Sequence, residues 1–379
     1  MFGPASRSFL AVSVAAFVAC LPLTLVVWNR VRGPVPLRVL QHLGLLLLCQ
    51  LTAVSALFAA VNQANDFYVT WGELAGAAEP GDVSIVPDGS APRPNATAPS
   101  TPAPTSTPST PAAPATSSGA AATTFTPDGT GLLVAQVHGP KSGVDGQILV
   151  WTPPGYSPTG DALPVLLTLD GSPGDPVDTY NGLQLIPKES ELLASGAVPP
   201  TLVVSATTNV DGKDWGCSNA PGDGPQVATW LTQDVPDIIS ASFHVQPVTS
   251  RRWQVMGYSS GATCSVRLAL TTPDLFSAAV SLAGSNVPDA RVLSGSAQAK
   301  RDNDLRTLAA AGTSRPVALL LAASKQDAST SSDALALQRA IGPNVTADLE
   351  MITRGGHNWD TWQAMTSPAL TWLAQHTGG

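Results

Sequence analysis

Two long uncharged stretches open the chain. No charged residue occurs between Arg7 and Arg30, and a second uncharged run extends over residues 39–61. At about 1.5 Å per residue, each run can cross a hydrocarbon core of about 30 Å. We therefore predict transmembrane helices at about 9–28 and 39–61, within a membrane anchor formed by residues 1–76. The alternative for the first run is a cleaved signal peptide, which usually has a shorter apolar part.

Basic residues predict how this anchor is oriented. Arg30, Arg32 and Arg38 lie between the two runs, whereas no Lys or Arg occurs between residue 61 and Arg93. Because cytoplasmic loops are enriched in Lys and Arg, the short connection is expected in the cytoplasm. We therefore expect a multi-pass protein of the cell membrane, with everything after residue 61 on the extracytoplasmic side.

A low-complexity stretch follows the anchor. Of the 35 residues from 90 to 124, 32 are Pro, Ala, Ser or Thr, a composition that cannot bury enough apolar surface to form a core. Extended at about 3.1 Å per residue, it could reach roughly 100 Å. We predict an extracytoplasmic linker over residues 77–124 that lifts the following domain off the membrane.

Short apolar runs alternate with amphipathic runs in residues 125–379. Helices are expected at Val227–Phe243 and Ser260–Leu270. Nearly continuous apolar runs are typical of parallel strands covered on both faces. The expected strands are Gln147–Thr152, Pro164–Leu169, Thr201–Ser205, Trp253–Met256, Ala278–Leu282 and Val317–Ala323. The alternation predicts an α/β domain with a doubly wound, mostly parallel sheet.

Composition narrows the function classes. The net charge is −8, from 19 basic and 27 acidic residues, which argues against a nucleic-acid partner because phosphate binding needs a basic surface. The sequence contains no zinc-binding motif of the C-x-x-C or H-E-x-x-H kind and no phosphate-binding G-x-x-x-x-G-K-[ST] motif. We therefore expect no metal and no cofactor.

The segment Gly257–Gly261 fits G-x-S-x-G between an expected strand and an expected helix. In this arrangement the serine stands on a sharp turn at the carboxyl edge of the sheet. Ser259 is therefore the candidate nucleophile; the alternative is an unreactive Gly/Ser-rich turn. Two backbone amides could stabilise the negative oxygen formed during ester cleavage, that of Ser260 and that of Ser172 in the loop after an early strand.

A serine nucleophile needs a base and an acid. His357 lies in a glycine-marked loop late in the chain, where the base follows the nucleophile in this type of fold. Asp327 follows the strongest late strand and would hold the histidine in the required tautomer. Asp333, six residues further on, is the alternative acid.

Cys217 and Cys264 both lie in residues 125–379, here named the outer domain. This domain is expected in a compartment that permits disulfides. A bridge between them is expected to fix the Cys217 loop beside the candidate nucleophile. The alternative is two free buried thiols.

The outer domain resembles the esterase D-like α/β hydrolases, a group that includes secreted bacterial mycolyltransferases. The similarity covers about 230 residues and rests on several separate motifs. They are Leu149–Tyr156, Asp170-Gly171, Gly196–Val204, the Cys217 loop, Gly257–Gly261 with Cys264, Pro273–Phe276 and Gly356–Trp359. Two spans and a Pro/Thr linker look like the membrane-anchored actinobacterial members. The resemblance implies a Ser259, Asp327 and His357 triad.

These features together predict a membrane-tethered serine esterase that cleaves acyl esters, including esters of envelope lipids or glycolipids, through an acyl-enzyme. Two alternatives remain. The first is an acyltransferase that moves the acyl group to an envelope sugar. The second is an inactive binding protein that retains the fold, because fold alone does not dictate function.

Overall fold

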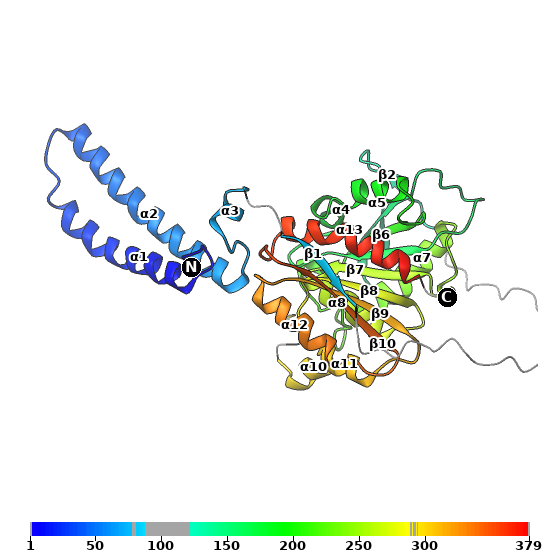
Figure 1. Ribbon diagram of the computed structural model, residues 1–379. Coiled ribbons are helices and arrows are strands. Elements are labelled where there is room, and N and C mark those ends of the chain that lie inside the picture. The colour runs from blue at the N-terminus through cyan, green and yellow to red at the C-terminus, as the bar shows by residue number, and fades with distance from the viewer. Residues whose placement is uncertain are drawn as a thin grey trace, which may run out of the picture.

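The computed structural model describes residues 2–77, 81–87, 122–288, 290, 293 and 295–377. At the N-terminus, α1 (Arg7–Trp28) and α2 (Val35–Asn65) form a hairpin that projects away from the sheet domain (Figure 1). Both helices are apolar and long enough to cross a membrane, as the sequence predicts. Large apolar side chains remain exposed along them, including Leu25 (71%) and Leu47 (64%). Such a continuous apolar surface is typical of contact with lipid or with another protein.

The sheet domain is built on ten strands in the order β1-β10-β9-β8-β7-β5-β6-β4-β3-β2. The six strands from β10 to β6 in this order run parallel, and the pairs at the two edges are antiparallel. The strands are β1 (Val83–Val86), β2 (Thr126–Pro127), β3 (Leu133–His138), β4 (Asp145–Trp151), β5 (Val165–Leu169), β6 (Leu202–Ala206), β7 (Trp253–Tyr258), β8 (Phe276–Leu282), β9 (Val317–Ser324) and β10 (Val345–Ile352).

Helices cover both faces of this sheet (Figure 1). One face packs against α4 (Pro176–Gly182), α5 (Leu185–Ala194) and α13 (Trp359–Gln375). The other packs against α7 (Val235–Ser242), α8 (Ser260–Thr271), α11 (Leu305–Ala311) and α12 (Ala328–Gln338). Shorter helices are α3 (Trp71–Leu74), α6 (Val227–Thr229) and α10 (Ala297–Asp302); a π-helical turn, Trp230–Asp234, joins α6 to α7. The predicted doubly wound α/β fold is confirmed.

All six predicted strands are present, with ends that differ by up to two residues. The residues of β5, β6, β7 and β8 are buried throughout, which explains their continuous apolar sequences. The predicted helix Ser260–Leu270 is α8. The predicted helix Val227–Phe243 consists of α6, the π-helical turn and α7, and Pro236 stands in the first turn of α7, directly after the π-helical turn.

The segment after the hairpin differs from the sequence prediction. Most of the predicted linker lies outside the described residues, but Val83–Val86, within its expected bounds of 77–124, form β1 and pair antiparallel with β10. The sheet domain therefore takes in a strand that precedes the low-complexity stretch. Residues 66–73 also contact the domain directly. The low-complexity stretch thus lies in the chain between β1 and β2, two strands of one sheet, and its role as a spacer stays a prediction.

Candidate active site

Ser259 stands on the turn between β7 and α8 with a backbone φ of 55° and ψ of −121°. A residue with a side chain rarely adopts this conformation, so the turn is strained. The flanking glycines make the turn possible. A Cβ on Gly257 would collide with the backbone of Gly261, and a Cβ on Gly261 would collide with the carbonyl oxygens of Leu169 and Asp170. The G-x-S-x-G pattern thus meets a steric requirement at both glycines.

The structure brings three of the predicted residues together. Ser259 Oγ lies 2.9 Å from His357 Nε2, and His357 Nδ1 lies 2.7 Å from Asp327 Oδ2. Asp333 does not take part: its carboxylate accepts a hydrogen bond from the backbone amide of Asn286. Of the two acids considered from the sequence, Asp327 is therefore the one beside His357.

Asp327 is almost completely buried, with 1% of its surface exposed. Burial alone would raise the pKa of its carboxyl group, but hydrogen bonding and charge from His357, together with hydrogen bonds from Thr330, outweigh it. The pKa of Asp327 consequently lies below its ordinary value. A carboxylate in this state can orient the imidazole ring and stabilise its protonated form.

A pocket of about 330 Å³ opens in front of Ser259. Its lining is largely polar and includes Ser172, Ser260, His357, Asp214 and Asn65. Ser172 and Ser260, whose amides were predicted to face a reacting oxygen, thus lie at the same pocket as the candidate nucleophile. Asn65 comes from the last turn of α2, so the N-terminal hairpin contributes to the wall of this pocket.

A buried network of hydrogen bonds around Asp170 and Asn209 holds the loop that carries Ser172. The Asp170 carboxylate accepts hydrogen bonds from Thr208 Oγ1 at 2.5 Å and Asn209 Nδ2 at 2.6 Å. The Asn209 side chain also donates to the carbonyl oxygens of Gly171 and Gly174. Burial raises the pKa of Asp170 to about 6, against the opposing effect of these hydrogen bonds. This network fixes the loop beside Ser259.

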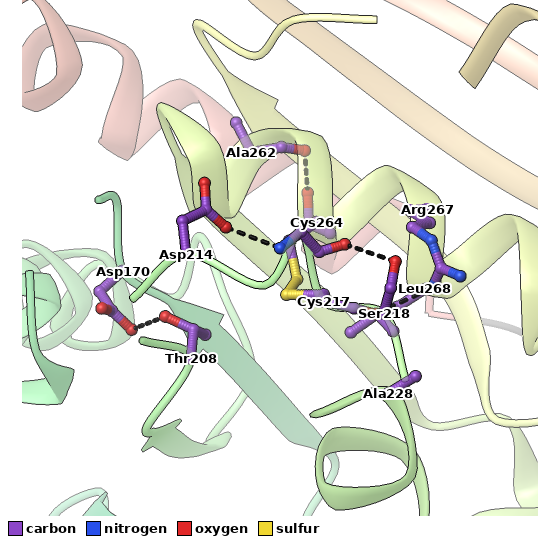
Figure 2. Close-up of a disulfide and its surroundings, with 12 residues drawn as sticks. Asp170, Thr208, Asp214, Cys217, Ser218, Ala228, Ala262, Cys264, Arg267 and Leu268 are labelled. Atoms are coloured by element: carbon purple, nitrogen blue, oxygen red, sulfur yellow. Dashed lines mark hydrogen bonds between the residues drawn. A yellow bond between two sulfur atoms is a disulfide. The ribbon is translucent and has the colours of Figure 1, made fainter. Parts of the chain in front are cut away.

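Cys217 and Cys264 form a disulfide, which joins the loop after β6 to α8 (Figure 2). Arg267 strengthens the same connection, because its guanidinium donates to the Cys217 carbonyl oxygen at 2.9 Å. Asp214, on the bridged loop (Figure 2), accepts a hydrogen bond from the amide of Gly216 and lines the pocket. The bridge therefore fixes one wall of the pocket, as the sequence analysis expected.

Residues 65–73 contribute to the site in a way that the sequence did not predict. The backbone carbonyl of Asp66 accepts from the His357 amide at 2.9 Å, and Glu73 Oε1 accepts from the Gly356 amide at 2.9 Å. One local signal was available. Thr70 and Glu73 form a capping box at the start of α3, and T-x-x-E is the sequence signature of that motif. The signature predicts a helix start but not its contact with His357.

Among the described residues, no cluster of three or more His, Cys, Asp or Glu side chains is arranged to hold a metal ion.

The fold and this site define a serine hydrolase of the α/β-hydrolase class. Residues 141–373 match the profile of the esterase family, which carries the description "Putative esterase". The match covers more than half of the chain, and the chain belongs to this family. It is accordingly an ester hydrolase. No curated protein sequence matches it.

Three similar solved structures are distant from this chain in sequence. An S-formylglutathione hydrolase from Agrobacterium tumefaciens has a TM-score of 0.56 and 20% identity over 67% of this chain and 99% of its own. A ferulic acid esterase has a TM-score of 0.49 and 16% identity, over 64% and 98%. A fluorophosphonate-binding serine hydrolase of Staphylococcus aureus has a TM-score of 0.48 and 16% identity, over 64% and 98%. The likeness to the first of these shows the fold.

Proposed function

We propose that the chain is a membrane-tethered, extracytoplasmic serine esterase that cleaves carboxylic esters through an acyl-enzyme on Ser259. The observation that supports this most directly is the unbroken hydrogen-bond relay from Ser259 through His357 to Asp327. Each of the three residues comes from a different loop at the carboxyl ends of the parallel strands, which is where ligands bind in open α/β sheets.

In the first half of this reaction, Ser259 Oγ attacks the ester carbonyl carbon while His357 Nε2 takes the hydroxyl proton. The carbonyl oxygen becomes negative and accepts hydrogen bonds from the amides of Ser172 and Ser260. Asp327 stabilises the protonated imidazole. The bond to the leaving oxygen then breaks, and His357 returns the proton to that oxygen, which departs as an alcohol.

In the second half, an acceptor hydroxyl attacks the acyl-enzyme and gives its proton to His357, which passes it to Ser259 Oγ as the acyl–serine bond breaks. With water as acceptor the product is a carboxylic acid. With a sugar hydroxyl it is a new ester, the acyltransferase alternative. The polar pocket wall around Asp214 and Asn65 can accommodate either hydroxyl, and membership of the esterase family favours water.

The position of the pocket supports a substrate borne by the membrane. Asn65 lines the pocket and follows the end of the predicted span at residue 61 by four residues, a rise of about 6 Å. Lipid headgroups occupy about this depth beyond the hydrocarbon core. An acyl ester of an envelope lipid or glycolipid would thus meet Ser259 close to the membrane surface.

Labelling with a fluorophosphonate tests the proposed nucleophile. We expect the full chain in detergent or nanodiscs to acquire one adduct, located on Ser259 by mass spectrometry, and to hydrolyse short p-nitrophenyl esters. The Ser259→Ala variant should lose the adduct and nearly all of the hydrolysis. A folded, disulfide-bonded wild-type protein that neither labels nor turns over these esters would favour the inactive binding protein instead.

The proposed acid is tested by comparing two aspartates, one at the N-cap of α12 and the other within that helix. Asp327→Asn keeps the shape of the side chain but removes the charge that fixes the histidine tautomer, so kcat should fall by roughly 10³–10⁴-fold. Asp333→Asn, whose carboxylate contacts the Asn286 amide instead, should retain kcat within about threefold. Equal losses in the two variants would contradict the assignment of Asp327.

A further inference from the structure

We propose that residues 66–73, here named the juxtamembrane clamp, position the His357 loop and make the membrane hairpin a working part of the active site. The inference rests on the proposed esterase function and goes beyond it, since a membrane anchor alone needs no contact with the catalytic residues. Its central positioning residue is Glu73, and a second is Asn62 in the last turn of α2.

Glu73 connects the clamp to the residue before His357. Its Oε1 atom accepts from the Gly356 amide at 2.9 Å, while Oε2 accepts from the amides of Val69 at 2.6 Å and Thr70 at 2.9 Å. One carboxylate thus joins the clamp to Gly356, which lies 283 positions after Glu73 in the chain. Hydrogen bonds to an ionised acceptor are stronger than those between neutral groups, so this contact fixes the loop firmly.

Two backbone carbonyls of the clamp hold the residues on the other side of the loop. The carbonyl of Asp66 accepts from the His357 amide at 2.9 Å, and that of Phe67 accepts from Asn358 Nδ2 at 2.7 Å. The Phe67 ring also lies beside the imidazole, with 6.5 Å between ring centroids. His357 is therefore flanked by clamp contacts at its own amide and at both neighbouring residues.

The turn that presents these carbonyls is fastened to α2. Asn62 is 1% exposed, and its side chain both donates to the Tyr68 carbonyl oxygen at 2.9 Å and accepts from the Tyr68 amide at 2.8 Å. Tyr68 follows Phe67 directly, so this pair of bonds sets the direction of the Asp66 and Phe67 carbonyls. Through Asn62, the end of the second membrane helix is linked to the catalytic loop.

Gly356 shows that the approach of the clamp is close. A Cβ at this position would collide with the carbonyl oxygens of Asp66 and Phe67. The clamp thus explains why the residue directly before His357 is a glycine. A side chain at this position would push the clamp and the His357 loop apart.

Substitution of the two positioning residues in the full chain tests the proposal. Glu73→Ala and Asn62→Ala should each lower kcat by about 10- to 100-fold, because small displacements of a catalytic group have effects of this size. KM should stay within about twofold, since neither side chain lines the pocket. Glu73→Gln, which keeps one carbonyl oxygen, should give an intermediate loss. Glu191→Gln, an exposed carboxylate on α5, is the matched control.

Active-site titration separates positioning from folding. A purely structural defect would reduce the number of sites that react with fluorophosphonate but leave kcat per reactive site unchanged, whereas mispositioning lowers kcat per site. Values within twofold of the wild type for both alanine variants would overturn the proposal, even if Ser259 were confirmed as nucleophile. Loss of turnover in the wild type itself would count against the esterase function instead.

Hydrogen exchange gives a readout that does not depend on turnover. The amides of Gly356 and His357 donate to the clamp, so a peptide spanning residues 354–358 should exchange faster in Glu73→Ala and Asn62→Ala than in Glu191→Gln. Unchanged exchange in both alanine variants would show that the clamp does not hold the loop.

Discussion

The buried carboxyl groups of this chain fall into two groups, those that accept several hydrogen bonds and those with oxygens that accept none. Asp327 and Asp170 accept hydrogen bonds from several side chains and amides, as their positions at the active site require. Glu189 and Glu350 are buried to 3% and 0% exposure, and in the part of the chain that the structure describes Glu189 Oε2 and both Glu350 oxygens have no hydrogen-bond partner. Burial raises the pKa of both glutamates, that of Glu189 to about 7. These two residues reduce stability at neutral pH.

The raised pKa of Glu189 predicts how the stability of a Glu189→Gln variant depends on pH. Because its folded-state pKa is raised above the ordinary 4.5, wild-type stability should fall as the pH rises from about 4.5 to about 7 and then level off. The glutamine variant lacks this loss, so its free energy of unfolding at pH 8 should exceed that of the wild type by about 3 kcal/mol. At pH 4 the two should be nearly equal.

Denaturant unfolding of the full chain at both pH values measures the difference. Glu191→Gln, on the same helix but exposed, serves as the control and should change stability by less than about 0.5 kcal/mol. An equal gain at pH 4 and pH 8 would show that the effect does not come from ionisation of Glu189.

Among the structural elements, those with a pattern in their own local sequence could be predicted, whereas those that depend on contacts with distant residues could not. The central strands were predictable because burial on both faces makes them continuously apolar, and the turn at Ser259 was predictable because its glycines and serine are adjacent. β1 was missed because it is only four residues long and mostly exposed, and a strand this short is hard to tell from a loop by its pattern alone. The clamp was unpredictable because no local pattern relates residues 66–73 to residues 356–358.

β1 offers a comparison of two valines in one strand. Val83 packs against the core on the α13 face of the sheet, whereas Val86 is 50% exposed. Val83→Asp would place a charge in that contact and should lower the free energy of unfolding by about 1–2 kcal/mol. Val86→Asp should have little effect. The two variants are compared by thermal unfolding of the full chain, and an equal loss would contradict the packing of β1 seen here.

For the whole molecule, the main consequence is that the hairpin and the sheet domain form one unit. α2 ends at Asn65 on the wall of the pocket, and the clamp follows directly beside His357. The loop between α1 and α2 lies at the far end of the hairpin from the domain (Figure 1). If the hairpin spans the membrane, this loop and the active site face opposite compartments.

Single cysteines test this arrangement. Leu74 and Asn29 are both exposed, one near the domain and one at the far end of α1. In intact cells, a membrane-impermeant thiol reagent should label Leu74→Cys but should label Asn29→Cys only after the cells are opened. Cys20 and Cys49 lie within the apolar helices and Cys217 and Cys264 are bridged, so the parent chain is the background control. Labelling of Asn29→Cys but not of Leu74→Cys in intact cells would show that the predicted orientation of the hairpin is the wrong way round.

The pairing of β1 with β10 also changes what a cut in the low-complexity stretch would do. That stretch leaves β1 at one edge of the sheet, and the chain returns as β2 at the opposite edge. A protease that cleaves there would yield two fragments that remain joined by the pairing of β1 with β10. The contacts between the clamp and the His357 loop would also hold them together. The product would be a split enzyme whose two parts stay assembled. Release of the sheet domain from the hairpin would therefore require β1 to separate from β10 as well.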